Sequence, residues 1–169
     1  NPDEIIRFVQ QIAPNFAGIN LEDISAPRCF QIEESLQNIG IPVFHDDQHG
    51  TAIAVTAALH NAAKVVKKPF NSLKVIIVGA GAAGIAIGRM LLGLDCFGKK
   101  CRRFSGIQSV GDLILVDKKG ALYSGRGDQN IYKQAVAVMS NKLKKTGNLA
   151  QVVKGADVII GVSRPNTIT

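Results

Sequence analysis

One short segment restricts the possible folds of this chain more than any other. Four apolar residues, Val75-Ile76-Ile77-Val78, run directly into the glycine-rich turn Gly79-Ala80-Gly81-Ala82-Ala83-Gly84. A continuous apolar run of this length is typical of a strand that is buried on both faces, as in a parallel sheet covered by helices. Glycines at this spacing after such a strand favour a turn into a helix that binds the pyrophosphate of a dinucleotide.

Helical and strand-like patterns alternate along the rest of the chain, which predicts parallel pairing. Strands are expected at 17–21, 41–44, 75–78, 113–116 and 158–162, and helices near the N-terminus and at 27–40, 51–66, 82–94, 131–142 and 149–153. We expect an α/β fold in which a doubly wound parallel sheet of the Rossmann type, residues 70–169, follows part of an α/β catalytic domain, residues 1–69. The boundary is set at Lys67-Lys68-Pro69, a charged pair followed by a helix breaker.

Two segments have weaker patterns. The alanine-rich helix expected at 51–66 is apolar nearly all round, which indicates a buried helix. Residues 95–111 have no clear period and are expected to form an inserted loop.

The composition argues against two classes of partner. The net charge is +7, but the basic residues are scattered, and the chain has no Trp and only two Tyr, so stacking platforms for nucleic acid are lacking. No apolar stretch approaches the length of a membrane span, and the run that starts at Val75 is broken by Gly79. We therefore expect neither a nucleic-acid nor a membrane partner.

The cysteines and the N-terminus indicate the compartment. Three cysteines, Cys29, Cys96 and Cys101, are an odd number and argue against a disulfide framework, so we expect reduced thiols. No signal-peptide pattern follows Asn1. We expect a cytoplasmic location, and we interpret a chain that begins with Asn rather than Met as a piece of a longer protein.

Each glycine of the turn has an expected task. Gly79 permits the tight turn, Gly81 lets backbone N–H groups approach the pyrophosphate, and Gly84 allows the helix to pack closely on the strand. Asp117 ends the next strand and is expected to accept hydrogen bonds from the adenosine ribose. Its carboxylate would repel a 2′-phosphate, which favours NAD, although Lys118 and Lys119 could offset that repulsion.

Two acidic pairs follow predicted strands. Glu22-Asp23 and Asp46-Asp47 lie at neighbouring strand ends, where an α/β fold gathers its ligand groups. Carboxylates from separate segments suit a hard divalent cation, although Asp46 or Asp47 could instead cap the helix that follows. The flanking histidines, His45 and His49, are interpreted as structural residues or partners of the ligands.

Several segments, taken together, resemble the malic enzymes of the bacterial type. The resemblance covers nearly the whole chain in order and weakens only across 95–111. It is carried by Gly18-Ile19-Asn20-Leu21-Glu22-Asp23-Ile24-Ser25-Ala26-Pro27, Pro42-Val43-Phe44-His45-Asp46-Asp47-Gln48-His49-Gly50-Thr51-Ala52, the glycine turn and Gly155-Ala156-Asp157-Val158-Ile159-Ile160-Gly161-Val162-Ser163.

The resemblance implies a function: oxidative decarboxylation of malate to pyruvate and CO₂ with reduction of NAD or NADP. It also implies that Glu22, Asp23 and Asp47 hold Mg²⁺ or Mn²⁺, and that Asp46 contacts the catalytic lysine. Ser163 is expected to bind the cofactor. The tyrosine acid and lysine base of the family fall outside this chain, and a homodimer or larger homo-oligomer is expected.

Two other functions stay open on the residues alone. An amino-acid or other hydroxy-acid dehydrogenase would share the glycine turn but would not need the carboxylates Glu22, Asp23 and Asp47. A nucleotide-sensing module would bind the cofactor without chemistry. Metal-dependent turnover separates the malic-enzyme function from both.

Overall fold

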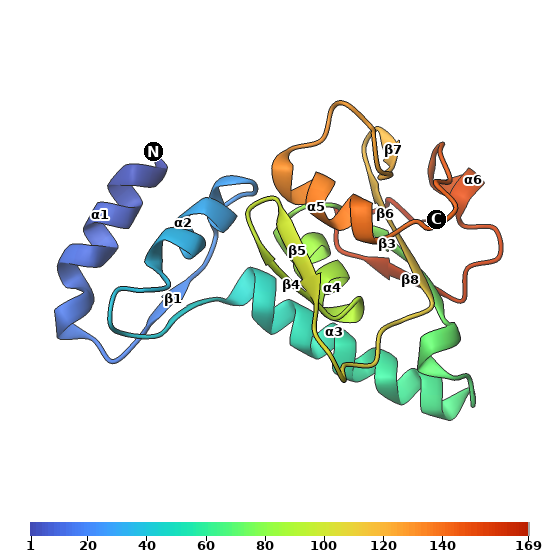
Figure 1. Ribbon diagram of the computed structural model, residues 1–169, viewed down its shortest axis with the longest axis horizontal. Coiled ribbons are helices and arrows are strands. Elements are labelled where there is room, and N and C mark those ends of the chain that lie inside the picture. The colour runs from blue at the N-terminus through green and yellow to red at the C-terminus, as the bar shows by residue number, and fades with distance from the viewer. Residues whose placement is uncertain (169) are drawn as a thin grey trace.

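The computed structural model describes residues 1–168, which form a small N-terminal lobe and a larger α/β part. Figure 1 shows the lobe, in blue, set beside the larger part, with the long helix α3 (Asp46–Val65) running from one to the other. The lobe contains the elements before α3, which are α1 (Pro2–Ile12), η1 (Ala13–Asn15), β1 (Ile19–Leu21), α2 (Arg28–Leu36) and β2 (Val43–His45). The elements after α3 belong to the larger part.

The remaining elements occur in an alternating order along the chain. The other helices are α1 (Pro2–Ile12), η1 (Ala13–Asn15), α2 (Arg28–Leu36), η2 (Phe70–Ser72), α4 (Ala82–Leu91), α5 (Ile131–Met139) and α6 (Leu149–Val152). The strands are β1 (Ile19–Leu21), β2 (Val43–His45), β3 (Lys74–Val78), β4 (Leu94–Phe97), β5 (Lys100–Arg103), β6 (Asp112–Asp117), β7 (Gly120–Ala121) and β8 (Val158–Gly161).

A four-stranded sheet lies at the centre of the larger part. Its strand order is β7-β6-β3-β8, and β3 pairs in parallel with both β6 and β8, while the short β7 pairs antiparallel with β6. The chain therefore places β6 on one side of β3 and then crosses to place β8 on the other. The expectation of an α/β fold with parallel sheets is confirmed.

Alternate residues of β3 enter two separate cores. Val75 and Ile77 belong to a core that includes residues of α3, α4 and α5, whereas Ile76 and Val78 pack with Val152 of α6. Both faces of the strand are thus covered, which explains why it is apolar without alternation. Figure 1 shows α4 and α5 on one side of the sheet and α6 on the other.

The N-terminal lobe has its own small core. The strands β1 and β2 pair in parallel, so that Leu21 lies opposite His45. Helices α1 and α2 cover this pair with the buried side chains Val9, Ile32 and Leu36. The helix α1 begins as the sequence predicts, because the Asn1 side chain accepts a hydrogen bond from the Asp3 N–H at 3.1 Å.

The helix α3 differs from its prediction in two respects. It begins at Asp46 rather than Thr51, so that Asp46 and Asp47 occupy its first turn, where carboxylates interact favourably with the helix dipole. It is also buried on one face only. Leu59 is 6% exposed, whereas Val65 near the end of the helix is 81% exposed.

The ends of three other helices were also misjudged. The helix α2 ends at Leu36 rather than at Gly40. The helix α4 ends at Leu91 rather than Leu94, because Leu94 begins the strand β4. The helix α5 ends at Met139 rather than Lys142. Asn141 has a φ of +48°, outside the helical range, and its N–H donates to the Leu113 carbonyl.

The prediction of a loop at 95–111 was wrong for residues 95–103, whereas residues 104–111 contain no helix or strand. The strands β4 and β5 form an antiparallel hairpin in which Cys96 lies opposite Cys101. The two cysteines form a disulfide, so the expectation of three reduced thiols is also wrong; Cys29 is free and buried. A spacing of five residues gave no hint of this pairing because it arises only when the two strands face each other.

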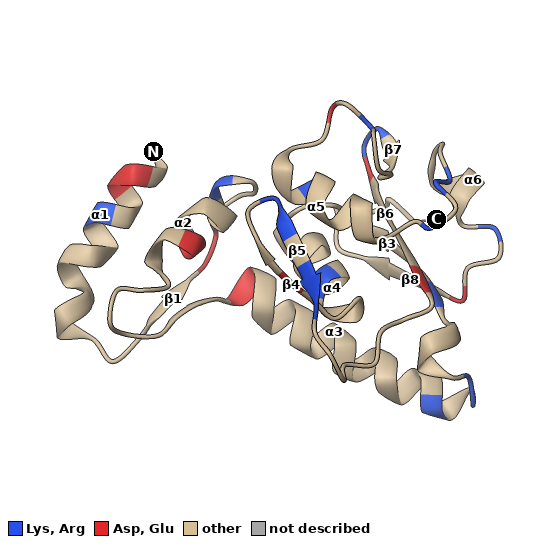
Figure 2. Ribbon diagram, in the orientation of Figure 1, with Lys and Arg blue, Asp and Glu red and all other residues tan. Residues whose placement is uncertain are grey.

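The charged side chains are scattered and do not form one continuous patch. Figure 2 shows the Lys and Arg residues, in blue, on separate elements, with one group along the β4–β5 hairpin, and an acidic segment where α3 begins beside the lobe. Within residues 1–168, every helix is too short or too polar to cross a lipid bilayer.

Candidate functional site

The glycine turn lies at the carboxyl end of β3, between the two parallel neighbours of that strand. Gly79 adopts a φ of +117°, a conformation that side chains disfavour. A Cβ at this position would lie 2.7 Å from the Val162 carbonyl oxygen, in the segment that follows β8. The turn is therefore tight for two independent reasons, its backbone angle and its contact with the neighbouring strand.

The other two glycines of the turn have contrasting surroundings. A Cβ at Gly84 would overlap the Gly79 carbonyl oxygen at 1.8 Å, so the helix α4 approaches the turn too closely for a side chain. A Cβ at Gly81 would meet no atom within 4 Å. Gly81 therefore opens onto empty space at the N-terminus of α4, where free backbone N–H groups favour an anion.

A single hollow joins this turn to the acidic residues. It has a volume of about 530 Å³, and Asp23, Asp47, Thr51 and Gly81 are among the residues that line it. Asp47 accepts a hydrogen bond from the Asp23 backbone N–H at 2.9 Å. Asp23 has a φ of +58°, which Asp tolerates better than most residues. The structure thus brings two of the four carboxylates to the mouth of the glycine turn.

The other two carboxylates are oriented differently. Glu22 accepts a hydrogen bond from the Asn20 side chain at 2.9 Å and does not line the hollow. Asp46 lies against Gly50, where a Cβ would come within 2.0 Å of its Oδ1. Within residues 1–168, no group of three or more His, Cys, Asp or Glu side chains is arranged to hold a metal ion. The expected set of Glu22, Asp23 and Asp47 stays a prediction.

Asp117 ends β6, as the sequence predicts, but its oxygens already have donors. Arg126 Nη2 contacts both oxygens at 2.9 and 2.8 Å, Lys133 Nζ contacts Oδ2 at 2.7 Å, and the Lys119 N–H contacts Oδ1 at 3.0 Å. Burial raises the pKa of Asp117, but these hydrogen bonds outweigh it and hold the pKa below its usual value. A carboxylate offers about four lone-pair sites, and four contacts occupy them here.

Arg126 and Lys133 are the site residues that sequence reasoning missed. Neither residue was singled out as a site residue from the sequence. Arg126 also donates to the Gly120 and Ala121 carbonyls, which fixes it beneath β7. No signal in the sequence pairs Arg126 with Asp117, because the contact depends on how the segment after β7 folds back.

Ser163 lies in a second hollow at the same edge of the sheet. This hollow has a volume of about 360 Å³ and is lined by Val78, at the end of β3, and by the segment that follows β8, including Ser163. The Val162 N–H donates to the Val78 carbonyl at 2.9 Å, which holds this segment beside the glycine turn. Ser163 therefore lies close to the glycine turn, and its contact with a cofactor stays a prediction.

The two histidines near Asp46 and Asp47 do not line the hollow at the glycine turn. His49 Nε2 lies 2.5 Å from Glu33 Oε1, and Gln48 donates to Glu33 Oε2 at 2.9 Å, so Glu33 joins α2 to the first turns of α3. His45 is fully buried, and neither of its ring nitrogens has a partner within residues 1–168.

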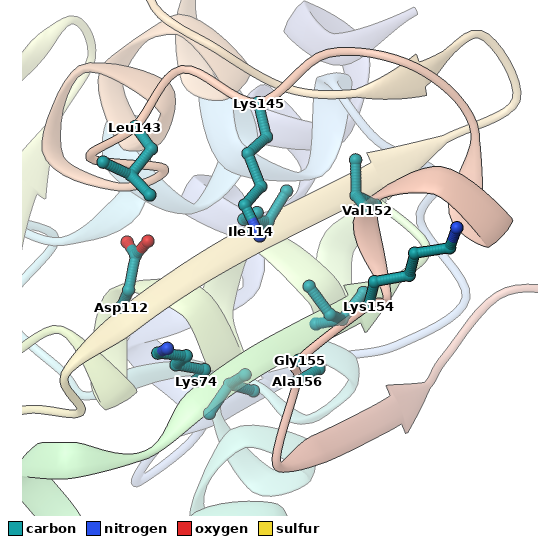
Figure 3. A pocket seen from close by; sticks show the side chains of 11 residues that line it. Lys74, Asp112, Ile114, Leu143, Lys145, Val152, Lys154, Gly155 and Ala156 are labelled. Carbon is teal, nitrogen blue, oxygen red and sulfur yellow. The ribbon is translucent and has the colours of Figure 1, made fainter.

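A further hollow, drawn in Figure 3, does not belong to this site. It lies beside the first residues of β3 and β6, at the amino end of the sheet, and Lys74, Asp112 and Lys145 are among its lining residues. Its volume is only about 60 Å³, and Figure 3 shows Lys154 pointing away from it. Since the glycine turn is at the opposite end of β3, this hollow has no access to it.

The sequence and the structure both match known proteins. Residues 48–168 match the family described as "Malic enzyme, NAD binding domain", and residues 1–37 match "Malic enzyme, N-terminal domain". The NAD-dependent malic enzyme of Geobacillus stearothermophilus is 46% identical over 167 residues, covering 98% of this chain and 32% of that protein. The NADP-dependent malic enzyme of Halomonas elongata is 41% identical over 170 residues, covering 100% of this chain and 36% of that protein.

A solved structure of a malic enzyme also resembles this chain. The NAD-dependent malic enzyme from Thermotoga maritima aligns with a TM-score of 0.88 at 39% identity, covering 100% of this chain and 42% of that one. The chain spans about a third of the length of the curated relatives described above.

Proposed function

Because the chain belongs to the malic enzyme family, we propose that it forms the metal and cofactor sites of an enzyme that converts malate to pyruvate and CO₂. NAD or NADP is the proposed hydride acceptor. One observation carries the proposal: Asp23 and Asp47 line the same hollow as Gly81. A substrate bound to a metal at these carboxylates would therefore lie beside the cofactor.

The fit of a metal to this hollow is supported by two of its three expected ligands. Asp23 and Asp47 are joined by a hydrogen bond and offer oxygens of the kind that Mg²⁺ and Mn²⁺ prefer. Glu22 would complete the set if its carboxylate left Asn20, which it contacts across the surface of the lobe. A bound dication supplies Lewis acidity toward the hydroxyl and ketone oxygens of the substrate.

The position of the cofactor is supported by the form of the turn. We propose that the sheet is the core of a doubly wound Rossmann-type domain, since β6 and β8 lie on opposite sides of β3. The pyrophosphate would lie at Gly81 and the N-terminus of α4, with Ala80, Ala82, Ala83 and Ser163 beside it. This chain would then orient the nicotinamide toward the metal site, while the cofactor itself accepts the hydride.

The choice between NAD and NADP depends on the groups around Asp117. Its charge is already balanced by Arg126 and Lys133, at side-chain exposures of 10% and 21%. A ribose hydroxyl would have to displace one of these donors, and a 2′-phosphate would meet cations as well as a carboxylate. We keep NAD as the proposed cofactor, with NADP as the alternative that Arg126 and Lys133 favour.

Three further assignments stay predictions. These are the division of the chain at residues 69 and 70, the role of Asp46 as the partner of a catalytic lysine, and the assembly into a homodimer or larger oligomer. A cytoplasmic location likewise stays a prediction.

The experiment measures turnover by the protein in its full natural length. With malate, Mn²⁺ and either NAD or NADP, reduced nicotinamide and pyruvate should form in equal amounts, and chelation of the metal should abolish both. Asp47→Asn should lower kcat/KM by about 10²-fold or more, because it removes a metal ligand. Oxidation of lactate at a similar rate without a metal would instead support a simple hydroxy-acid dehydrogenase.

A further inference from the structure

The base and the tip of the β4–β5 hairpin are held in different ways. The two strands form a separate two-stranded sheet with four residues in each strand. At the base, Leu94 is buried in the core, and Arg103 donates to the Leu92 carbonyl at 3.0 Å. Near the tip, Phe97 is 69% exposed. A two-stranded hairpin is only marginally stable in water, so its exposed tip needs a further restraint.

A disulfide and a hydrogen bond restrain this tip. The disulfide joins Cys96 and Cys101, which lie directly opposite each other on the two strands. The Gly98 N–H, in the turn between the strands, donates to Glu34 Oε1 of α2 at 3.0 Å. The other oxygen of Glu34 accepts from the Tyr132 hydroxyl of α5 at 3.3 Å. Glu34 thus joins the tip to the N-terminal lobe and to α5, and the disulfide holds the turn in place for this contact.

The disulfide is in a part of the hairpin that a small thiol can reach. Cys96 and Cys101 are both partly exposed. Cys96 also lines two hollows, one of about 350 Å³ beside α4 and one of about 290 Å³ beside α2. Cys29, in contrast, is fully buried. Because thiol–disulfide exchange requires access to a sulfur atom, we expect it at the hairpin and not at Cys29.

We propose that Cys96 and Cys101 form a thiol–disulfide switch that controls the docking of the hairpin tip on the N-terminal lobe. In the oxidised state, the crosslink closes the loop 96–101 and restricts the open conformations of the tip. In the reduced state, the tip opens more often, and each opening breaks the hydrogen bond from Gly98 to Glu34. The base stays in place because its contacts with the core do not depend on the disulfide. Reduction therefore opens the tip locally and leaves the rest of the protein folded.

A dithiol carries out the reduction. Its thiolate attacks one sulfur of the Cys96–Cys101 bond to give a mixed disulfide, and its second thiol then displaces that protein sulfur. The protein S–S bond is broken, two protein thiols are formed, and the dithiol leaves as a cyclic disulfide. Two electrons and two protons thus pass to the protein. Glutathione disulfide reverses the change, and two molecules of glutathione thiol are then released.

The switch also affects the proposed metal site, and this effect rests on the proposed function. The lobe supplies Asp23 to that site, whereas α3 supplies Asp47. The contacts of Glu34 with Gly98 and Tyr132 help to hold the lobe against the larger part. When the contact with Gly98 is lost, the lobe has more freedom relative to α3. The reduced protein should therefore bind Mn²⁺ more weakly than the oxidised protein.

Hydrogen exchange of the protein in its full natural length tests the switch. Dithiothreitol should reduce the disulfide in the folded protein and speed exchange at residues 95–103 by about 10- to 40-fold, because closure of a short loop restricts the open state by a factor of this size. Exchange in β3 and β6 should not change. The double variant Cys96→Ser, Cys101→Ser should exchange rapidly with or without dithiothreitol. Cys29→Ala is the matched control and should keep the response of the wild type.

Two results would overturn the switch. One is a disulfide that resists dithiothreitol in the folded protein, and the other is equal exchange at residues 95–103 in the oxidised and reduced wild type. Either result would show that the disulfide is a fixed crosslink.

The effect on the metal site is measured separately, by calorimetric titration with Mn²⁺ after the reductant is removed. Reduction should raise the Kd for Mn²⁺ about fivefold in the wild type and leave it unchanged in the double variant. An equal Kd in both states of the wild type would show that the switch does not reach the site. If Mn²⁺ binds to neither state, the proposed function is contradicted, and the exchange result still decides the switch.

Discussion

At the scale of single residues, the three glycines of the turn are required for different reasons. Gly79 has a positive φ and contacts the segment after β8. Gly84 lies so close to the Gly79 carbonyl that a side chain would overlap it, whereas a side chain at Gly81 would extend into empty space. The first two are requirements of folding. Folding does not require a glycine at Gly81, since no atom occupies the space that a side chain would fill. An empty space of this kind is what a ligand-binding site requires.

This contrast predicts opposite effects for two alanine substitutions. Gly79→Ala should destabilise the protein by about 2–4 kcal/mol, through the strained φ and the overlap with Val162. Gly81→Ala should change stability by less than about 0.5 kcal/mol but weaken cofactor binding roughly tenfold or more, because the methyl group would occupy the space of the pyrophosphate. Urea unfolding and cofactor titration check both. A large loss of stability in Gly81→Ala would remove this argument for the cofactor site.

Asp117 predicts a dependence of stability on pH. Its pKa is lowered in the folded protein, so its contribution is present above the unfolded value of about 4 and is lost as the pH falls through the folded pKa. Asp117→Asn should therefore cost about 3 kcal/mol at pH 7, and the difference from the wild type should shrink in acid.

Asp95→Asn is the control for this prediction. Asp95 pairs with Arg102 at an exposed position, where the side-chain exposures are 41% and 79%. Its loss should cost less than about 1 kcal/mol at pH 7. A free energy of unfolding for Asp117→Asn that parallels the wild type at every pH would contradict the assignment of Arg126 and Lys133 as its partners.

At the scale of elements, the β4–β5 hairpin is the part that the sequence pattern describes least well. Its strands are short, its apolar residues do not alternate cleanly, and the disulfide closes it across the two strands. The hairpin is tied to the lobe by the hydrogen bond from Gly98 to Glu34 and to α4 by Arg103, which donates to the Leu92 carbonyl. It therefore acts as a bridge between the two parts of the molecule.

The disulfide between Cys96 and Cys101 can be tested by counting the reactive thiols of the protein. Protein purified without reductant and then denatured should show one reactive thiol, and reduction should raise the number to three. In the native state Cys29 should react slowly, because burial raises its pKa to about 11. Replacing both Cys96 and Cys101 by Ala should cost about 2 kcal/mol, a small value because the closed loop is short. Three thiols in the denatured, unreduced protein would show that the bond does not form.

At the scale of the whole molecule, the proposed site lies where the lobe meets the larger part. The lobe supplies Asp23, the long helix α3 supplies Asp47, and the sheet supplies the glycine turn. The hydrogen bond between Asp23 and Asp47 and the contacts of Glu33 with Gln48 and His49 hold the lobe to the start of α3. A metal at this junction would bind the folded arrangement and not the separate segments.

Mn²⁺ should therefore stabilise the folded protein. At a concentration about 100 times its Kd, the expected gain is about 2.7 kcal/mol, seen as a higher Tm that chelation reverses. Asp47→Asn should lose this gain, whereas Asp3→Asn, in the first turn of α1 and far from the hollow, should keep it. An equal rise in Tm for Asp47→Asn and the wild type would place the metal elsewhere.

The sequence by itself determined the features that depend on local pattern. The apolar run before Gly79, the acidic residue at the end of β6 and the positions of most helices and strands follow from periodicity and glycine spacing. For the site, the same patterns predicted the turn and the two acidic pairs, and the resemblance to a family implied the metal ligands and the chemistry.

The tertiary structure alone decided the features that join distant segments. The pairing of Cys96 with Cys101, the cations that surround Asp117 and the unmatched donors of Arg89 all depend on which surfaces meet. The helix α3 is buried on one face only, although its composition suggested otherwise. The periodicity of a segment reflects its backbone hydrogen bonding and which of its faces is buried. Contacts between segments that are distant in the sequence depend on how those segments pack, and such contacts produce no periodic pattern in the sequence.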